Sequence, residues 1–260
     1  MPQVKRTIAD AKWQLPPSNL SLARNEVHLW RATIDVPSPL VSSIWKMLSA
    51  DETDRANRFV FERDCHRFVV ARGFLRMILG WYIHRRADEL QFDYTKHGKP
   101  CLAEPYADTD LKFNVSHSTN FALYGLTLGR EIGVDLEQVR SDIEIEQIAS
   151  RMFSTNEVRQ LRSLPSDDVR VWAFFNCWTR KEAFLKAKGS GLFFPLDQFS
   201  VTLLPGDPAS LVETQWNMYE MQRWSLEAID VAQGYAAAIA VEGNNWSLHQ
   251  WEANEEIFGI

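Results

Sequence analysis

The sequence has few of the residues from which disulfide or zinc frameworks are built. Only three cysteines occur among 260 residues, Cys65, Cys101 and Cys177, and no two of them form a Cys-x-x-Cys pair. An odd number of scattered cysteines excludes a zinc ribbon and gives no disulfide framework. The six histidines include no His-Glu-x-x-His motif, which excludes the zinc-protease helix of that type. We therefore expect reduced thiols.

Long apolar runs are also missing. No stretch approaches the ~18 apolar residues of a membrane helix, and the first residues lack the apolar core of a signal peptide. The formal net charge of −6 argues against a protein that covers long nucleic acid, which requires a broad basic surface. We expect a cytoplasmic protein with neither membrane nor nucleic acid as a partner.

The charge that is present is unevenly distributed. Residues 55–99 contain ten Lys or Arg against five Asp or Glu, a local balance of +5 that leaves −11 for the rest of the chain. Such a segment in an acidic protein favours one compact anionic ligand. The composition, 45% hydrophobic and 24% charged, is that of an ordinary folded protein with a sizeable core.

Patterning predicts a mixture of helices and strands. In the first part it predicts strands over 27–33, 111–115, 121–128 and 132–136, and helices from the Ser49/Glu52 capping box and over 64–82. Gly129-Arg130 is predicted to turn between the last two strands, which would pair antiparallel. Gly73, within the second helix, indicates close packing or close approach of a ligand.

The second part repeats this mixture. It predicts helical structure over 141–164, a long helix that opens at Ser166 and ends at Gly189, and strands over 199–204, 224–229, 235–241 and 246–251. Helices combined with antiparallel strands in both parts predict an α+β fold.

Two short motifs carry chemistry. In Gly133-Val134-Asp135-Leu136-Glu137, strand alternation puts the two carboxylates on one face, where they could bind a magnesium ion or simply face solvent. In the helical run from Phe174 to Gly189, Trp178, Glu182 and Lys186 follow at four-residue steps on one face. Alone, Glu182 and Lys186 could be only an exposed ion pair.

Taken together, five blocks resemble the Sfp-type, HetI-like 4'-phosphopantetheinyl transferase family over about residues 48–204. They are Gly98-Lys99-Pro100, Phe113 to Ser118, Gly133 to Glu137, Trp178 to Gly189, and Pro195 to Ser200, in the family's order and spacing. Five blocks in register are far more specific than any one of them. The alternatives are a magnesium-dependent phosphohydrolase and a binding module for coenzyme A or carrier protein that has lost its chemistry.

The resemblance implies a reaction. A serine of an apo acyl or peptidyl carrier protein attacks coenzyme A, takes its 4'-phosphopantetheine group and releases adenosine 3',5'-bisphosphate. Asp135, Glu137 and Glu182 would hold Mg²⁺, and Lys186 would stabilise charge on a phosphate. Lys181 could also touch phosphate or only extend from the helix. Either Glu182 or a metal-bound water could take the serine proton.

The family also implies a nucleotide site and an architecture. The residues carried over to the adenine and the ribose 3'-phosphate are Arg55, Arg67, Gly98, Lys99, Pro100, Ser116 and His117. One departure is Glu52, which replaces a basic residue of many relatives and predicts a modestly weaker 3'-phosphate contact. The implied fold is a pseudo-two-fold pair of α+β halves with antiparallel sheets, in a monomer. We place an arm at 1–25, the nucleotide half at 26–130 and the metal half at 131–260, with the active site between the halves.

Overall fold

The computed structural model describes residues 13–189, 191 and 194–259. Residues 1–12 of the predicted N-terminal arm lie outside the described part of the chain. So do Ser190, Leu192, Phe193 and Ile260. In the described part of the chain, no helix combines the length and the apolar character that crossing a bilayer requires.

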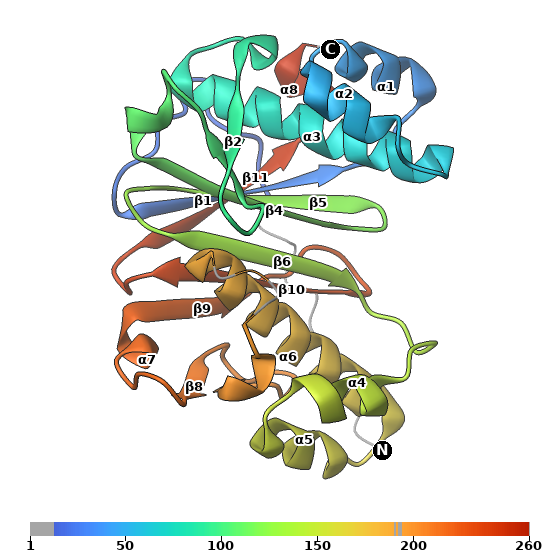
Figure 1. Cartoon of the computed structure of the whole chain (residues 1–260), viewed down its shortest axis with the longest axis vertical. Helices are drawn as coiled ribbons and strands as arrows, with labels where there is room; N and C mark the ends of the chain where they lie inside the picture. The colour runs from blue at the N-terminus through green and yellow to red at the C-terminus, as the bar shows by residue number, and fades with distance from the viewer. Residues whose placement is uncertain (1–12, 190, 192–193, 260) are drawn as a thin grey trace.

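The helices and strands form two halves that lie one above the other (Figure 1). The first part of the chain contains β1 (Glu26–Thr33), α1 (Ser38–Trp45), α2 (Ala50–Ala56), α3 (Glu62–Ile83), β2 (Phe92–Tyr94), β3 (Pro100–Leu102), β4 (Leu111–Ser118) and β5 (Phe121–Leu128). The second part contains β6 (Ile132–Gln138), α4 (Ile145–Met152), α5 (Thr155–Arg162), α6 (Asp167–Lys188), β7 (Phe199–Val201), β8 (Leu211–Thr214), α7 (Glu220–Arg223), β9 (Trp224–Ala228), β10 (Tyr235–Glu242), β11 (Ser247–Ala253) and α8 (Glu255–Phe258).

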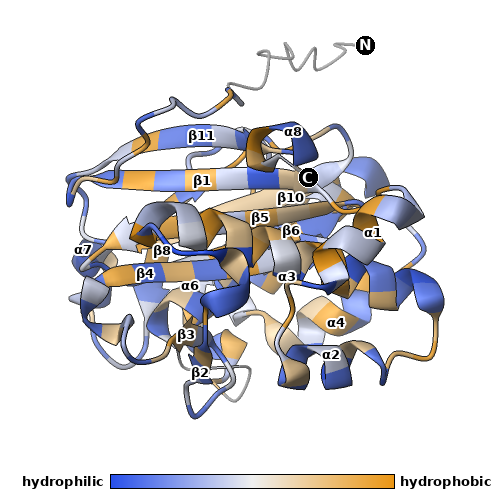
Figure 2. Cartoon of the chain, turned by 90° about the horizontal axis from the view of Figure 1, so that it is seen from above, coloured by the Kyte–Doolittle hydropathy of each residue, from blue (hydrophilic) through white to orange (hydrophobic). Residues whose placement is uncertain are grey.

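Two main sheets form the centre of the molecule. One has the strand order β11-β1-β5-β4 and the other β6-β10-β9. Helix α3 covers the outer face of the first sheet and α6 covers that of the second (Figure 1). A third apolar cluster, which includes Leu29, Leu123, Val134 and Ile239, fills the space between the sheets. Strand β10 is therefore apolar on both faces, and Figure 2 draws it mostly in hydrophobic shades.

The long helices begin and end where their sequence signals predict. Ser166 accepts a hydrogen bond from Val169 N at the start of α6, and Gly189 ends it in the left-handed conformation with φ 66°. Glu52 accepts from Ser49 N at 3.0 Å, so the capping box is confirmed. Gly73 lies against Ile44 of α1, where a β carbon would overlap that side chain. Packing therefore explains this glycine.

One expectation about connections is wrong. Residues 121–128 and 132–136 do not pair as a hairpin, since β5 pairs with β4 and β1 while β6 pairs with β10 in the other sheet. Gly129-Arg130 is thus a crossover between sheets. The helical structure predicted over 141–164 is confirmed; it consists of two helices, because Ser154 opens α5 with its own capping box.

Another feature of the fold concerns the end of the chain. Strand β11 pairs with β1, and this pairing is parallel. The predicted metal half, 131–260, therefore contains one strand that belongs to the sheet of the other half. The predicted arm also contacts β11, because Gln14 forms an isolated parallel bridge with Trp251 of that strand.

A clasp around Arg130 joins the two crossings between the halves. Its guanidinium donates to the carbonyl oxygens of Arg24 at 3.1 Å, Glu242 at 3.0 Å and Asn245 at 3.3 Å. One side chain therefore holds the chain before β1, the chain after β5 and the chain after β10 together.

Candidate active site

Strands β4 and β6 run beside each other at the junction of the two sheets, and polar side chains connect them. Asn114 Oδ1 accepts from Val134 N at 2.9 Å, Ser116 Oγ donates to Asp135 Oδ1 at 3.0 Å, and Ser118 Oγ donates to Glu137 Oε2 at 3.1 Å. Alternation along β4 puts these three residues on one side of the strand. The site is therefore built across the border between the halves.

Helix α6 supplies the other two groups of the second motif. Its close approach to β6 depends on Gly133, because a β carbon there would overlap the backbone of Ala183 and Ala187. Lys186 Nζ reaches Asp135 Oδ1 at 2.6 Å and Ser116 Oγ at 2.9 Å. The interpretation of Glu182 and Lys186 as an exposed ion pair is thus wrong, since Glu182 is buried and Lys186 is paired with Asp135.

The three acidic side chains interact electrostatically. Burial and, to a smaller extent, the charges of Asp135 and Glu137 together raise the pKa of Glu182 to about 7, against the opposing charge of Lys186. Burial and the charge of Asp135 also raise the pKa of Glu137. Asp135 Oδ2 and Glu182 Oε1 are buried without a hydrogen-bond partner among the described residues. Both are available to a cation.

This donor set fits a hard divalent cation in ligand type and in charge. The side chains do not yet converge, since among the residues that the structure describes no three Asp, Glu, His or Cys groups lie close enough together to hold a metal ion. In this arrangement the ammonium group of Lys186 neutralises Asp135 instead. That Asp135, Glu137 and Glu182 share one ion therefore stays a prediction.

A cavity of about 400 Å³ lies beside these groups, between the halves. It is lined by Gly98, Lys99 and Pro100 from the first half and by Glu182 and Lys186 from α6, as predicted together from the sequence. Lys99 Nζ donates to Glu131 Oε2 at 3.1 Å and to Ile132 O at 3.0 Å, and burial lowers its pKa. Gly98 has φ 80°, a backbone conformation that glycine adopts readily.

The remaining predicted cations gather near His117. Burial lowers the pKa of His117, and the positive charges of Lys186, Arg55 and Arg67 lower it further. Arg67 donates to Asn120 Oδ1 at 3.1 Å, while the guanidinium of Arg55 lies 5.1 Å from the ring centre of Phe68. Concentrated positive charge without an acidic partner in this group suits a phosphate.

One prediction about a charged side chain requires correction, and the structure defines the surroundings of a second charged side chain. Lys181 cannot touch a phosphate, because its ammonium group is fully buried and binds Leu196 O, Phe199 O and Glu157. Glu52 is buried in ion pairs with Arg72 and Arg76, so it is an internal structural group. Its presence on α2 therefore adds no exposed negative charge beside Arg55.

Sequence reasoning missed several residues at the site. Ser118 and Asn114 bind β6, Glu131 binds Lys99, and His97 lines the cavity. The period of two through Asn114, Ser116 and Ser118 could have identified the first two. Nothing in the sequence places Glu131 or His97 there.

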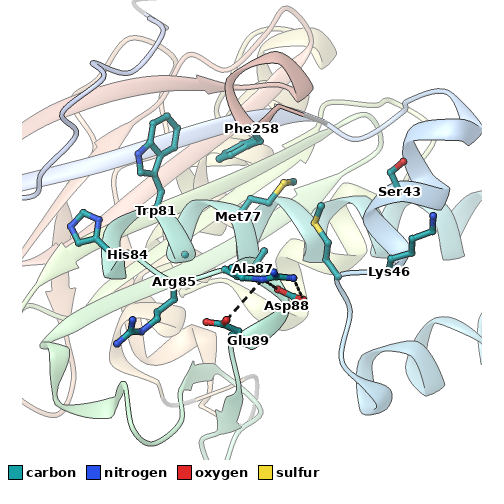
Figure 3. Close-up of a pocket in the computed structure, with 13 residues that line it drawn as sticks. Ser43, Lys46, Met77, Trp81, His84, Arg85, Ala87, Asp88, Glu89 and Phe258 are labelled. Carbon is teal, nitrogen blue, oxygen red and sulfur yellow. Dashed lines mark hydrogen bonds and ion pairs between the residues drawn. The ribbon is translucent and has the colours of Figure 1, made fainter.

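A larger hollow of about 890 Å³ lies elsewhere, at the end of α3. Figure 3 shows Met77, Trp81 and Phe258 among the side chains that line it, together with Asp88 and Glu89. Arg86 lines it as well. Arg86 is paired with Asp88 at 2.8 Å on the protein surface. None of the predicted site residues lines this hollow, so its size does not make it the active site.

Comparison with known proteins agrees with this geometry. Residues 131–240 match the 4'-phosphopantetheinyl transferase superfamily, and residues 36–125 match the N-terminal region of 4'-phosphopantetheinyl transferases. The 4'-phosphopantetheinyl transferase HetI of Nostoc sp. is 40% identical over 92% of this chain and 97% of its own length. The transferases ffp and Sfp of Bacillus subtilis are 33% and 31% identical, over 62% and 60% of this chain and 68% and 66% of their own. The predicted resemblance is confirmed, and this chain belongs to the 4'-phosphopantetheinyl transferase family.

Proposed function

We propose that this enzyme transfers 4'-phosphopantetheine from coenzyme A to a serine of an apo acyl or peptidyl carrier protein, with Mg²⁺ as cofactor and adenosine 3',5'-bisphosphate as the second product. The observation that carries the proposal is the cavity between the halves, where Lys99 and Pro100 face Glu182 and Lys186. A ligand with a nucleotide and a pyrophosphate would contact both halves there. Since one chain supplies both walls, we infer a monomeric enzyme.

Each group has a role in this proposal. Gly98, Lys99 and Pro100 form a wall for the adenine, and Arg55, Arg67 and His117 bind the 3'-phosphate. Asp135, Glu137 and Glu182 would hold Mg²⁺, which would supply charge neutralisation at the pyrophosphate. Lys186 stabilises charge on the transferred phosphate. The seryl nucleophile comes from the partner, so the chain needs no catalytic serine of its own.

Glu182→Gln tests the carboxylate directly. We expect the variant to lose magnesium affinity and to fall roughly 10²-fold or more in transfer rate, because the amide can neither bind the cation as a carboxylate does nor take a proton. Transfer is measured as the mass gain of an apo acyl carrier protein incubated with coenzyme A and Mg²⁺. Glu227→Gln is the matched control, because burial raises the pKa of that carboxyl too but β9 lies two strands away from β6.

The outcomes separate the alternatives. Loss of transfer with unchanged magnesium affinity would contradict the ligand role of Glu182. Breakdown of coenzyme A without a carrier-protein product would indicate a phosphohydrolase. Binding of coenzyme A with no reaction at all would indicate a binding module.

A further inference from the structure

The turn between α2 and α3 exposes three consecutive apolar side chains. The exposed fractions are 39% for Phe59, 89% for Val60 and 67% for Phe61. Single exposed apolar residues are normal on a protein surface. Three in a row, two of them aromatic, are instead typical of a surface that another molecule covers.

This turn is held in place. The ring of Phe59 packs on the ring of Phe68 in α3, with 5.4 Å between ring centres. The guanidinium of Arg55 lies over the same Phe68 ring. Phe59 N donates to Ala56 O, and Asp64 N and Cys65 N both donate to Phe61 O. Because the backbone is fixed on both sides, Val60 and Phe61 can be covered by a partner at small cost in conformational entropy.

Positive charge surrounds the exposed side chains. Residues 55–67 contain four arginines, Arg55, Arg58, Arg63 and Arg67, against only Glu62 and Asp64, in a chain of net charge −6. Among the described residues, the guanidinium of Arg58 has a hydrogen bond to the backbone oxygen of Asp54 and no acidic partner, and the ion pair of Arg63 with Asp64 is long, at 3.7 Å, and exposed. Such a pair contributes little, so the surface attracts an acidic partner.

The turn lies near the candidate active site. Arg55 and Arg67 act on His117, and His117 lies between Ser116 and Ser118, which bind Asp135 and Glu137. Figure 1 shows the α2–α3 turn and the segment that follows β6 at the same side of the molecule. A macromolecule bound on the turn would therefore reach the catalytic carboxylates, whereas coenzyme A has its own cavity.

We propose that Val60 and Phe61, with Arg58 and Arg63 beside them, form the docking surface for the carrier protein. A partner that fits this surface would present acidic residues around an apolar residue. This inference rests on the proposed function, because it names the contact that brings the serine of the protein substrate to the site.

The test compares substitutions at the turn with the same change elsewhere. Val60→Glu and Phe61→Glu place a negative charge in the contact, and Val212→Glu, whose side chain is 49% exposed on β8, is the control. With a purified apo acyl carrier protein as the varied substrate, we expect the turn variants to raise its KM about 5- to 30-fold. KM for coenzyme A should change less than about twofold, since the cavity is untouched. Arg58→Glu should raise KM for the carrier and weaken its dependence on salt.

Failure of this inference can be distinguished from failure of the proposed function. If the wild-type enzyme transfers the group and Val60→Glu leaves KM for the carrier unchanged, the turn is not the docking surface. If the wild-type enzyme transfers nothing but binds the carrier in calorimetry, weaker binding by Val60→Glu would still support docking. Loss of self-association in the variant with unchanged KM would show that the turn joins two copies of this chain, and would overturn the proposal.

Discussion

Lys181 offers a direct test of which residues of the second motif are structural and which contact the ligand. Its ammonium group could reach a phosphate as far as the sequence shows, but it is fully buried in the fold. Nζ donates to Leu196 O at 2.8 Å and to Phe199 O at 2.5 Å, and lies 2.8 Å from Glu157 Oε2. Lys181→Met keeps the length of the side chain and removes the charge. We expect the variant to lose stability and to keep its affinity for coenzyme A.

The expected loss of stability in Lys181→Met follows from the buried carboxylate of Glu157, which remains without its cation. In the variant, the carboxylate of Glu157 stays buried and keeps its hydrogen bonds from Ser154 N and Val201 N, both at 2.8 Å, but loses its cationic partner. Removing one partner of a buried ion pair costs about 3–5 kcal/mol. Removing both leaves no uncompensated charge, so Lys181→Met with Glu157→Gln should be more stable than Lys181→Met alone.

Urea unfolding followed by tryptophan fluorescence gives the free energy of unfolding by linear extrapolation, and steady-state kinetics on the folded protein give KM for coenzyme A. A loss of less than about 1 kcal/mol together with a KM for coenzyme A about tenfold higher would refute the reasoning. That result would mean that the ammonium group reaches the phosphates.

Two further predictions concern the carboxylates and the packing that positions them. Magnesium affinity should fall about tenfold from pH 8 to pH 6, because the pKa of Glu182 is about 7 and a carboxyl with a raised pKa binds a proton in place of the cation as pH falls through that value. Calorimetric titration at the two pH values measures this, and a flat profile would contradict it. Gly133→Ala should cost roughly 1–3 kcal/mol of stability and lower the transfer rate, since the new methyl group pushes α6, with Glu182 and Lys186, away from β6. Urea midpoints and rates measure both effects, and a variant with wild-type rate and stability would show that α6 does not need this contact.

The sequence predicts local structure better than it predicts connection. The signals at Ser166 and Gly189 fix the two ends of α6, because capping depends on side chains within one turn of the helix end. The wrong hairpin at Gly129-Arg130 and the parallel pairing of β11 with β1 both depend on contacts between distant segments. Alternating residues fit either arrangement, so no local pattern could decide between them.

The candidate site shows the same division. Spacing on a strand and on a helix left the roles of Asp135, Glu182 and Lys186 open, and the family resemblance made them candidates; in the structure, Glu182 and Lys186 line one cavity with Lys99 and Pro100. Lys181 is a lysine like Lys186 and lies one position before Glu182. Only its burial in the fold reveals that it points into the core. The partnership of Lys99 with Glu131 likewise depends on the fold, because the two residues come from different elements 32 positions apart.

The clasp at Arg130 has a consequence for how the two lobes can move. An enzyme whose two lobes are joined by one flexible linker can move about that linker. Here the backbone passes between the lobes twice at one edge, and the guanidinium of Arg130 holds both passages to the segment before β1. A protease nick near residue 130 would therefore leave the pieces associated, because the amino-terminal piece still needs β11 from the other to complete its sheet. The width of the cavity between the halves is accordingly a property of the assembled backbone, and the proposed donor would enter a gap that is largely formed before it arrives.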